Sequence, residues 1–426
     1  MGDEIDVRVE KGVYRGLGLA RHEGQVVLVP RGLPGDRFRV RVASASRGLL
    51  RVAPLERLED GPGRRPSPCS VSDACGGCAY QDLDYSRQLI LKELVLRESL
   101  ARAGAPFEGE IRLAPSPERG WRTRASLHCA YGDDAFRLGL HAEGSHRIVE
   151  FGPCLQLSAR ANAAVQGLRQ RLPARAGLAS RVASVDLAES TDGGEVVLGF
   201  RGDLRADDGP ALAATASEIP EITGIGFVTG RGGNGPFVLL RGDPYVHAQI
   251  LGRRLRAHLR SFFQANRFLV EDLARSVLEM VPSGGTVLDL YSGAGLFSVP
   301  LAARGDEVRG VEINEGAVRD AVANARGLGS ARFSVAEVGA DLSRSPRETA
   351  GTIVLDPPRT GAGREVVAGI ASRRPRVVVY VSCDPPTLGR DLADFARAGL
   401  RPDRIRAFDM FPDTFHVEAV VRLVPA

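Results

Sequence analysis

Apolar and polar residues alternate along residues 1–58 in a way that predicts short β-strands. Glycine-rich turns at 16–18 and 32–35 interrupt the alternation. Short strands separated by such turns are typical of a small barrel of the OB type, a fold that often binds oligonucleotides. A barrel with a purely structural role is the alternative. The alternating runs are Asp6 to Val13, Gln25 to Pro30 and Arg37 to Ala43, the last with one apolar face and one arginine face.

The pattern changes in the middle of the chain, where strand and helix signals mix. A linker rich in proline and glycine runs from Gly61 to Ser70, and helical periodicity follows from Tyr85 to Ala103. Short strands, glycine turns and one helix, from Ser158 to Arg171, continue to about residue 260. We therefore expect a central α+β domain at residues 59–260.

In residues 261–426, short buried strands alternate with helices. This alternation predicts a sheet of parallel strands with helices on both faces, which is a Rossmann-like architecture. Ligands of such sheets bind beyond the carboxyl ends of the strands. The expected strands are Thr286–Tyr291, Glu307–Ile313, Ala331–Val335, Thr352–Leu355, Arg376–Val381, Asp403–Phe408 and His416–Val424.

The net charge of +4 is small, but it is concentrated at one end of the chain. Residues 1–58 hold 11 Arg and Lys against 7 Asp and Glu, and Lys11 and Lys92 are the only lysines. One explanation for the preference for arginine over lysine is a coding bias. Arginine also binds phosphate through two parallel hydrogen bonds, so the same choice suits a nucleic-acid partner.

The sequence contains no apolar run of membrane-spanning length, and its acidic N-terminus lacks the features of a signal peptide. We therefore expect a cytoplasmic protein that binds no membrane. In that compartment the six cysteines are thiols or metal ligands rather than disulfides.

A glycine turn follows the first strand of the C-terminal region, at Asp289–Gly295 (D-L-Y-S-G-A-G), and Glu312 ends the next strand. An acid at this spacing accepts hydrogen bonds from ribose hydroxyls of a dinucleotide or of S-adenosylmethionine. Ser298 replaces the third glycine of a pyrophosphate-binding turn, which favours S-adenosylmethionine. Upstream, Gln264 and Asn266 could hydrogen-bond a ligand, or serve as a loop amide and a helix cap.

Three cysteines, Cys69, Cys75 and Cys78, lie within ten residues of one another. Cys129 or Cys154 could complete a site with four thiolates, which suits zinc or an iron–sulfur cluster. Structural zinc prefers two paired C-x2-C knuckles, so this spacing favours [4Fe–4S]. Cys154 lies in a turn that can present a ligand, whereas Cys129 lies in a strand.

Cys383 follows the strand that ends at Val381 and therefore lies over the carboxyl edge of the sheet. A lone cysteine is most often a small buried apolar residue. Here Asp356 ends the preceding strand, and the loop 410–418 returns an acid and a histidine to the same edge. A thiol, carboxylates and a glycine turn of the kind that binds a methyl donor, all on one edge, predict a reaction centre.

These motifs, in this order, resemble those of the S-adenosylmethionine-dependent RNA uracil-C5 methyltransferases with an N-terminal TRAM domain, which modify tRNA or 23S rRNA. The resemblance covers nearly the whole chain. It is carried by G-x-G-x-A (16–20), L-P-G-D (33–36), C-x5-C-G-G-C, F-x-Q-x-N, D-L-Y-S-G-A-G, D-P-P-R, S-C-D-P-x-T-L-x-R-D and M-F-P-x-T-x-H-V-E.

The resemblance implies a multi-domain α/β protein. The expected parts are an OB-type TRAM barrel at 1–58, a central iron–sulfur and RNA-binding α+β domain at 59–260, and a Rossmann-like class I methyltransferase sheet at 261–426. It implies a monomer that binds S-adenosylmethionine, a [4Fe–4S] cluster and RNA (23S rRNA or tRNA). By resemblance the residue roles are Cys383 as nucleophile, Glu418 as general base, Gln264, Tyr291, Glu312 and Asp356 as donor-binding residues, and Cys69, Cys75, Cys78 and Cys154 as cluster ligands.

One position departs from the family pattern, because Asp384 follows the nucleophile where many members have asparagine. A second negative charge beside the thiol would raise its pKa unless Asp384 points away or is paired. Two other functions are compatible with the motifs: an RNA-binding or RNA-folding protein with a vestigial methyltransferase fold, and a methyltransferase for another acceptor such as DNA or a small molecule.

Overall fold

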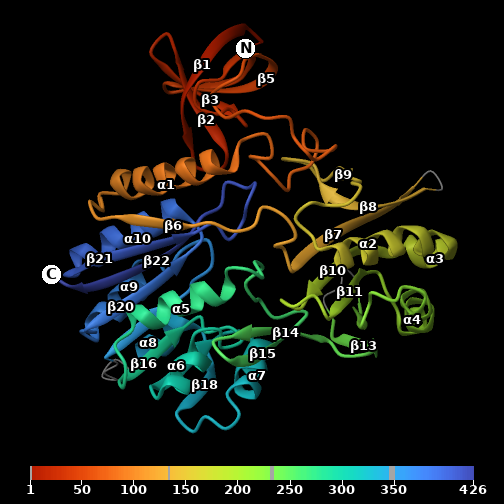
Figure 1. Ribbon diagram of the computed structural model, residues 1–426, viewed down its shortest axis with the longest axis vertical. Helices are drawn as coiled ribbons and strands as arrows, with labels where there is room; N and C mark the ends of the chain where they lie inside the picture. Colours follow the sequence, from red (N-terminus) through yellow and green to blue (C-terminus); the bar gives the residue numbers. More distant parts are fainter. Residues whose placement is uncertain (1, 133–134, 231–234, 345–350) are drawn as a thin grey trace.

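A closed barrel and three sheets organise the protein in the computed structural model, which describes residues 2–132, 135–230, 235–344 and 351–426. Figure 1 shows the barrel at the top, the large C-terminal sheet below it and the central sheet to the side. Within these described ranges, no helix is both long and apolar enough to cross a membrane.

The N-terminal barrel has five strands in the order β1-β2-β3-β5-β4 and confirms the predicted barrel. Its interior is filled by valines and by Phe38, which alternate with outward polar residues. The arginine face of β4 is not free: Arg39 pairs with Asp6 at 3.1 Å and Arg41 with Glu4 at 2.9 Å, both across on β1. The strands are β1 (Glu4–Val13), β2 (Leu17–His22), β3 (Gln25–Pro30), β4 (Arg37–Ser46) and β5 (Leu49–Glu59).

The central sheet has seven strands in the order β13-β12-β11-β10-β7-β8-β9, and helices pack on one of its faces. The predicted helix at 158–171 is confirmed as α2, which Ser158 caps by accepting a hydrogen bond from the Ala161 amide. The elements are β7 (Arg124–Gly132), β8 (Ala135–His141), β9 (Ile148–Val149), α2 (Ala159–Arg171), η1 (Leu172–Arg175), α3 (Ala176–Ala179), β10 (Val182–Glu189), β11 (Val196–Gly202), η2 (Ala206–Asp208), α4 (Gly209–Ser217), β12 (Gly224–Val228) and β13 (Phe237–Arg241).

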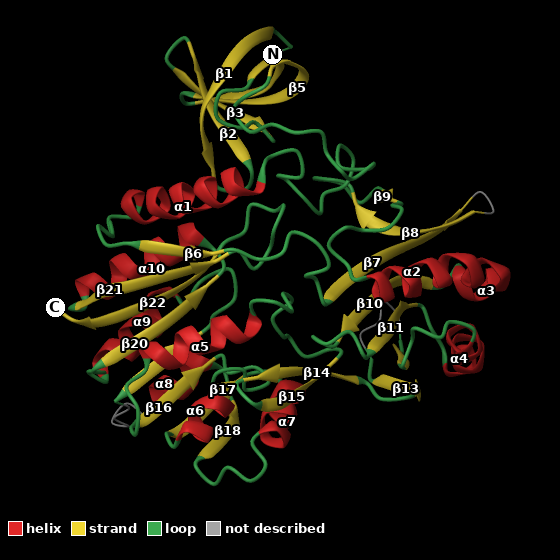
Figure 2. Ribbon diagram, viewed as in Figure 1, coloured by secondary structure: helices red, strands yellow, loops and turns green. Residues whose placement is uncertain are grey.

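The C-terminal sheet has eight strands in the order β18-β17-β16-β19-β20-β22-β21-β6, of which β6 (Ile111–Ala114) comes from the central segment. Helices cover both of its faces, as Figure 2 shows: α1 (Tyr85–Arg102), α8, α9 and α10 pack on one face, and α5 and α6 pack on the other. The strands are β16 (Thr286–Leu290), β17 (Glu307–Glu312), β18 (Ala331–Val335), β19 (Thr352–Leu355), β20 (Val377–Ser382), β21 (Leu400–Phe408) and β22 (Glu418–Pro425). The helices are α5 (Val270–Met280), α6 (Ser298–Arg304), α7 (Glu315–Asn324), α8 (Val338–Arg344), α9 (Gly363–Ser372) and α10 (Pro385–Arg397).

The expectation of a wholly parallel sheet is wrong for β22, which runs antiparallel to both β20 and β21. The physical reason is the short connection 409–417, because a crossover between parallel strands needs about a dozen residues or more. The antiparallel course brings the start of β22 to the edge at which β16, β17, β19 and β20 end.

Three parts of the central segment pack with the C-terminal sheet or with its helices. Helix α1 (Tyr85–Arg102) packs against α10, and β6 (Ile111–Ala114) pairs in parallel with β21. The hairpin of β14 (Tyr245–Ile250) and β15 (Arg253–His258) also packs its apolar side chains against α5. Nothing in the periodicity of these segments indicated which sheet they would join.

Candidate active site

Cys383 and Glu418 come together because β20 and β22 run in opposite directions. Ser382, the last residue of β20, pairs with Ala419, so Cys383 and Glu418 lie side by side at the same edge. Glu418 is only 2% exposed, and its charge acts directly on the Cys383 thiol. The chain thus joins two residues from distant motifs into one thiol–carboxyl pair.

Burial raises the pKa of Cys383 to about 12, and the carboxyls of Glu418 and Asp356 add to the rise. Arg359 opposes it, and the adjacent Asp384 adds a smaller increase. Cys383 therefore rests as a thiol, beside one cation that favours its ionised form. Sequence reasoning missed Arg359, although the D-P-P-R motif ends on it and no acid lies within two residues of it.

Two carboxyls share this site: Glu418 is buried and Asp356 is half-buried. Burial raises the pKa of Asp356 to about 7, with a contribution from Asp289, and a hydrogen bond from Gln264 opposes the rise. Burial also raises the pKa of Glu418 well above its usual range, and Asp356 adds to it while Arg359 opposes it. Gln264 and Asp356, predicted as donor-binding residues, therefore lie with the thiol–carboxyl pair.

Tyr291 and Glu312 lie at the glycine turn. The turn bends through left-handed backbone at Tyr291 (φ 62°), Gly293 (φ 54°) and Gly295 (φ 88°). A Cβ on Gly293 would meet no atom within 4 Å, so open space faces the backbone there. Glu312 accepts hydrogen bonds from the Gly293 amide at 3.1 Å and the Asn314 amide at 2.7 Å, which fixes its carboxylate at the turn.

Asn266 holds the turn that leads into α5, although it is not the N-cap of that helix, which is Leu269. It is fully buried, and its Oδ1 accepts hydrogen bonds from the amides of Phe268 at 2.9 Å and Leu269 at 3.1 Å. Its Nδ2 donates to Ser116 Oγ and to the Met410 carbonyl. The asparagine thus ties the start of α5 to the loop before β22.

Asp384 does not stand unpaired beside the nucleophile. It caps α10, where its Oδ1 accepts a hydrogen bond from the Thr387 amide at 3.0 Å. Its Oδ2 accepts a second hydrogen bond, at 2.6 Å, from the hydroxyl of Tyr14 in the N-terminal barrel. The pairing that the sequence left open is therefore present, and half of it comes from another domain.

Side chains of α1 hold the loop 409–417 in place. Lys92 Nζ lies 2.5 Å from Asp409 Oδ1 and donates to the Phe411 carbonyl at 3.0 Å. Gln88 Nε2 donates to Asp413 Oδ1 at 3.0 Å. Asp413, in the middle of this loop, therefore faces α1, and burial raises its pKa to about 6.

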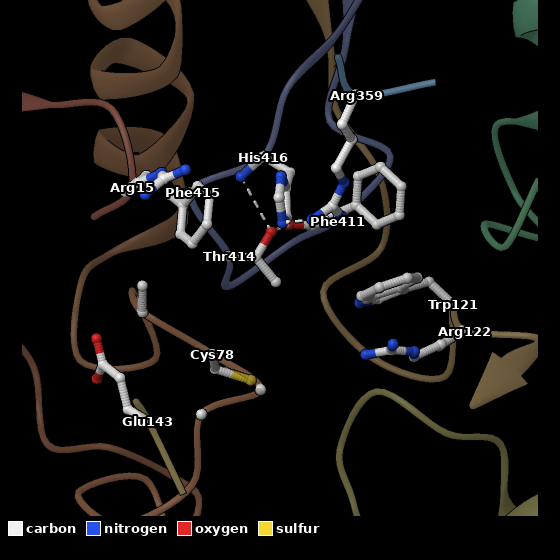
Figure 3. A pocket seen from close by; sticks show the side chains of 13 residues that line it. Arg15, Cys78, Trp121, Arg122, Glu143, Arg359, Phe411, Thr414, Phe415 and His416 are labelled. Carbon is white, nitrogen blue, oxygen red and sulfur yellow. Dashed lines mark hydrogen bonds between the residues drawn. The ribbon is translucent and has the colours of Figure 1, made fainter. Parts of the chain in front are cut away.

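A cavity of about 290 Å³ opens beside this loop. It lies between the barrel, the segment 69–79 that carries three cysteines (the cysteine segment) and the central domain. Figure 3 shows His416 and Phe415 across from Trp121 and Arg122. Burial and the nearby Arg359 lower the pKa of His416 to about 3, so its ring is neutral. Trp121 and Arg122 precede the central strands without any motif, which is why sequence reasoning missed them.

Four of the six cysteines are linked to one another by electrostatic interactions. The charges of Cys69 and Cys154 act on the Cys75 thiol, and those of Cys75 and Cys154 act on Cys78. For Cys129 the rise in pKa, to about 12, comes from burial alone. Within the described residues, no three acids, histidines or cysteines are close enough to hold a single metal ion.

Amide groups hydrogen-bond the cysteine sulfurs. Gln156 Nε2 lies 2.9 Å from Cys78 Sγ and Gln81 Nε2 lies 3.5 Å from it, while the Gly77 amide lies 3.4 Å from Cys75 Sγ. Gln81 also donates to Asp413 Oδ2 at 2.9 Å. The cysteine segment is thereby tied to the loop before β22.

Comparisons with known proteins agree with this geometry. The family model described as tRNA (uracil-5-)-methyltransferase matches residues 84–425, and the TRAM domain model matches residues 1–51. A 23S rRNA (uracil(1939)-C(5))-methyltransferase, RlmD, from Pseudomonas aeruginosa is 34% identical over 99% of this chain and 94% of its own. An uncharacterized RNA methyltransferase from Aquifex aeolicus is 30% identical over 98% of both chains.

Among solved structures, the tRNA (uracil-54, C5)-methyltransferase of Pyrococcus abyssi, in complex with S-adenosyl-L-homocysteine, superposes with a TM-score of 0.76. It is 26% identical and covers 98% of this chain and all of its own. The chain therefore belongs to the tRNA (uracil-5-)-methyltransferase family of S-adenosylmethionine-dependent RNA methyltransferases, with a TRAM domain at its N-terminus.

Proposed function

We propose that the protein methylates C5 of a uridine in RNA with Cys383 as nucleophile and Glu418 as general base. One observation carries the proposal: the antiparallel course of β22 sets Glu418 beside Cys383 at the edge that also bears the glycine turn. This reaction needs a nucleophile, a base and a binding site for the methyl donor, and the nucleophile, the base and the glycine turn lie on one edge.

The chemistry explains the need for both residues. C5 of uracil is too weak a nucleophile to attack a methyl donor unaided. When the Cys383 thiolate bonds to C6, the ring electrons form an enolate with negative charge on C5. C5 would then take the methyl group from a sulfonium donor, whose S–CH3 bond breaks and leaves its electron pair on a neutral thioether sulfur. The Glu418 carboxylate then removes the C5 proton, the electron pair restores the C5–C6 double bond, and the thiolate leaves.

Ionisation of Cys383 has to accompany binding, because burial raises its pKa to about 12. Arg359 is the cation that favours the thiolate, since it lowers the pKa of Cys383 and also that of Glu418. The Asp356 carboxylate can take up the thiol proton, because its pKa is raised to about 7 and it exchanges a proton near neutral pH. Glu418 is then left as the base for the C5 proton.

The glycine turn fits S-adenosylmethionine. Ser292 Oγ and Asp289 Oδ1 are buried there without a hydrogen-bond partner among the described residues. Ile313 is 67% exposed next to Glu312 and offers an apolar cover for an adenine. When bound, S-adenosylmethionine supplies a methyl group activated by its sulfonium.

Tyr291 and Glu312 would hold the nucleoside part of the donor. Glu312 keeps acceptor capacity for ribose hydroxyls beyond its two backbone hydrogen bonds. Gln264 and Asp356 suit the methyl-bearing end, because that end has to reach the uracil and both residues lie with the thiol–carboxyl pair.

The RNA that we propose is 23S rRNA, with tRNA as the second candidate. The support is the 34% identity to the Pseudomonas rRNA enzyme over 99% of this chain, against 26% to the archaeal tRNA enzyme. The target uridine has to leave its stack to reach a half-buried thiol, so a loop or another unpaired region suits the site better than a duplex.

We also propose that Cys69, Cys75, Cys78 and Cys154 hold a [4Fe–4S] cluster. Their mutual electrostatic influence and the amide donors to Cys75 and Cys78 sulfur support this, because such hydrogen bonds stabilise cluster thiolates. A four-iron cluster holds its thiolates farther apart than one ion does, so the lack of a single-ion site among the described residues does not oppose it. The cluster would act as a rigid crosslink near the RNA site, without a redox step.

The test uses labelled S-adenosylmethionine and RNA from cells that lack this gene. Wild type should transfer label to 5-methyluridine, identified after digestion to nucleosides. Cys383→Ala should abolish transfer, and Glu418→Gln should trap a covalent protein–RNA adduct that survives a denaturing gel. Full activity of Cys383→Ala would contradict the mechanism. RNA binding without donor binding would favour the vestigial fold, and label in DNA or a small molecule would favour another acceptor.

A further inference from the structure

The turn between β1 and β2 of the barrel reaches into the catalytic domain. Tyr14 lies on this turn, and its ring meets the Phe415 ring edge-on at 5.5 Å. A Cβ on Gly16 would lie 2.9 Å from the Ala79 side chain, so the turn also packs tightly against the cysteine segment. The barrel is therefore part of the wall around the active site as well as a separate domain.

The Tyr14 hydroxyl donates its hydrogen bond to the residue that follows the nucleophile. The 2.6 Å bond to Asp384 Oδ2 complements the helix-capping bond from the Thr387 amide to Oδ1, so each carboxylate oxygen has one donor. Burial and the Asp384 carboxylate raise the pKa of Tyr14, which keeps the hydroxyl protonated as a donor. The carboxylate is thus held from two sides, by α10 and by the barrel.

We propose that Tyr14 is a positioning residue for the nucleophile: its hydroxyl holds the Asp384 carboxylate at the start of α10 and keeps that charge from turning toward the Cys383 thiolate. The role in catalysis rests on the proposed function, whereas the effect on the thiol does not. An asparagine at position 384 would cap the helix without a charge, so this chain needs the tyrosine because it has the acid.

The charges that face Cys383 come from several elements. Glu418 on β22, Asp356 after β19 and Asp384 before α10 raise its pKa, and Arg359 lowers it. Without the Tyr14 hydroxyl, only the hydrogen bond from the Thr387 amide would hold the Asp384 carboxylate, and fewer hydrogen bonds would offset its negative charge. The thiolate would then form at higher pH.

The first test measures the alkylation rate of Cys383 by iodoacetamide between pH 7 and 10, followed on the Cys383 peptide by mass spectrometry in the full-length protein. Tyr14→Phe should slow alkylation about threefold to tenfold at every pH of this range, because the whole range lies below the pKa of Cys383 and the thiolate fraction falls as that pKa rises. Asp384→Asn should speed alkylation. In the Asp384→Asn background, Tyr14→Phe should have no further effect. Tyr245→Phe on β14 is the matched control for loss of a hydroxyl.

The second test measures single-turnover methyl transfer to RNA from cells lacking the gene. Tyr14→Phe should lower the rate by about tenfold near pH 7, the size expected for loss of one hydrogen bond to a charged group, with little change in the KM for RNA. Asp384→Asn should restore the rate. Equal alkylation of Tyr14→Phe and wild type, or an equal loss in both Asp384 backgrounds, would overturn the proposal. If wild type methylates no RNA, the proposed function fails while the alkylation series still decides the role of Tyr14.

Discussion

Replacement of Lys92 by methionine should destabilise the loop before β22 more than any exposed lysine change could. Lys92 is 1% exposed and Asp409 is fully buried, and 2.5 Å separates Nζ from Oδ1. Loss of one partner from a buried ion pair leaves the other charge uncompensated, which costs about 3–5 kcal/mol of the free energy of unfolding. The Phe411 carbonyl would lose its donor as well.

The chain supplies a matched control, because its other lysine is also paired. Lys11 lies 2.7 Å from Glu98, but these side chains are 46% and 27% exposed. Lys11→Met should therefore cost less than about 1 kcal/mol. The double variant Lys92→Met with Asp409→Leu should recover most of the loss, since it removes both buried charges and fills the space with apolar atoms.

The only tryptophan of the chain reports on this loop. Trp121 is fully buried, and its ring meets the Phe411 ring edge-on at 5.8 Å. Urea unfolding followed by tryptophan fluorescence therefore measures the stability of the structure that Lys92 holds. Equal midpoints for Lys92→Met and Lys11→Met, or no recovery in the double variant, would refute this reasoning.

Three further expectations concern the cysteines, the histidine and the glycine turn. Cys154→Ser should lower the iron bound per chain after anaerobic purification, whereas Cys129→Ser should leave it unchanged; a colourless, zinc-loaded wild type would contradict the cluster. Burial lowers the pKa of His416 to about 3, so the unfolded chain binds a proton at this histidine more readily than the folded protein does. The contribution of the neutral ring to the free energy of unfolding is present above pH 6.5 and should be lost as pH falls toward 3. In His416→Gln, melting temperatures between pH 7 and 4 should fall less steeply, and an unchanged slope would exclude this origin. Glu312→Ala should weaken S-adenosylmethionine binding at least about tenfold in calorimetry, whereas Glu315→Ala should not; equal affinities would exclude the ribose contact.

Local patterns predicted much of the fold. Alternation along 1–58 identified the barrel, and strand–helix alternation after residue 261 identified the large sheet. Both succeed because a buried strand face has to be apolar wherever its partner comes from. The position of β6 had no such signature, because its place beside β21 depends on a pairing partner far along the chain.

The residues of the site likewise fall into two groups, those that local patterns predict and those whose position depends on a distant part of the chain. Cys383 and Glu312 lie at strand ends, so their common edge followed from strand order alone. That Glu418 lies beside Cys383 depends on the direction of β22, which the length of the connection 409–417 determines. The bond between Tyr14 and Asp384 joins two domains, and no periodicity within either one could have predicted it.

The strand β6 also constrains how the protein is made. Its segment leaves the ribosome well before β21, the strand beside which it will lie. Until the end of synthesis β6 has no partner, and the sheet cannot close its edge. A fragment that begins at residue 261 would expose the hydrogen-bonding groups of β21, which invites association between copies. The methyltransferase sheet is therefore not a module that evolution or an experimenter can remove at a linker, because the segment 85–114 has to accompany it.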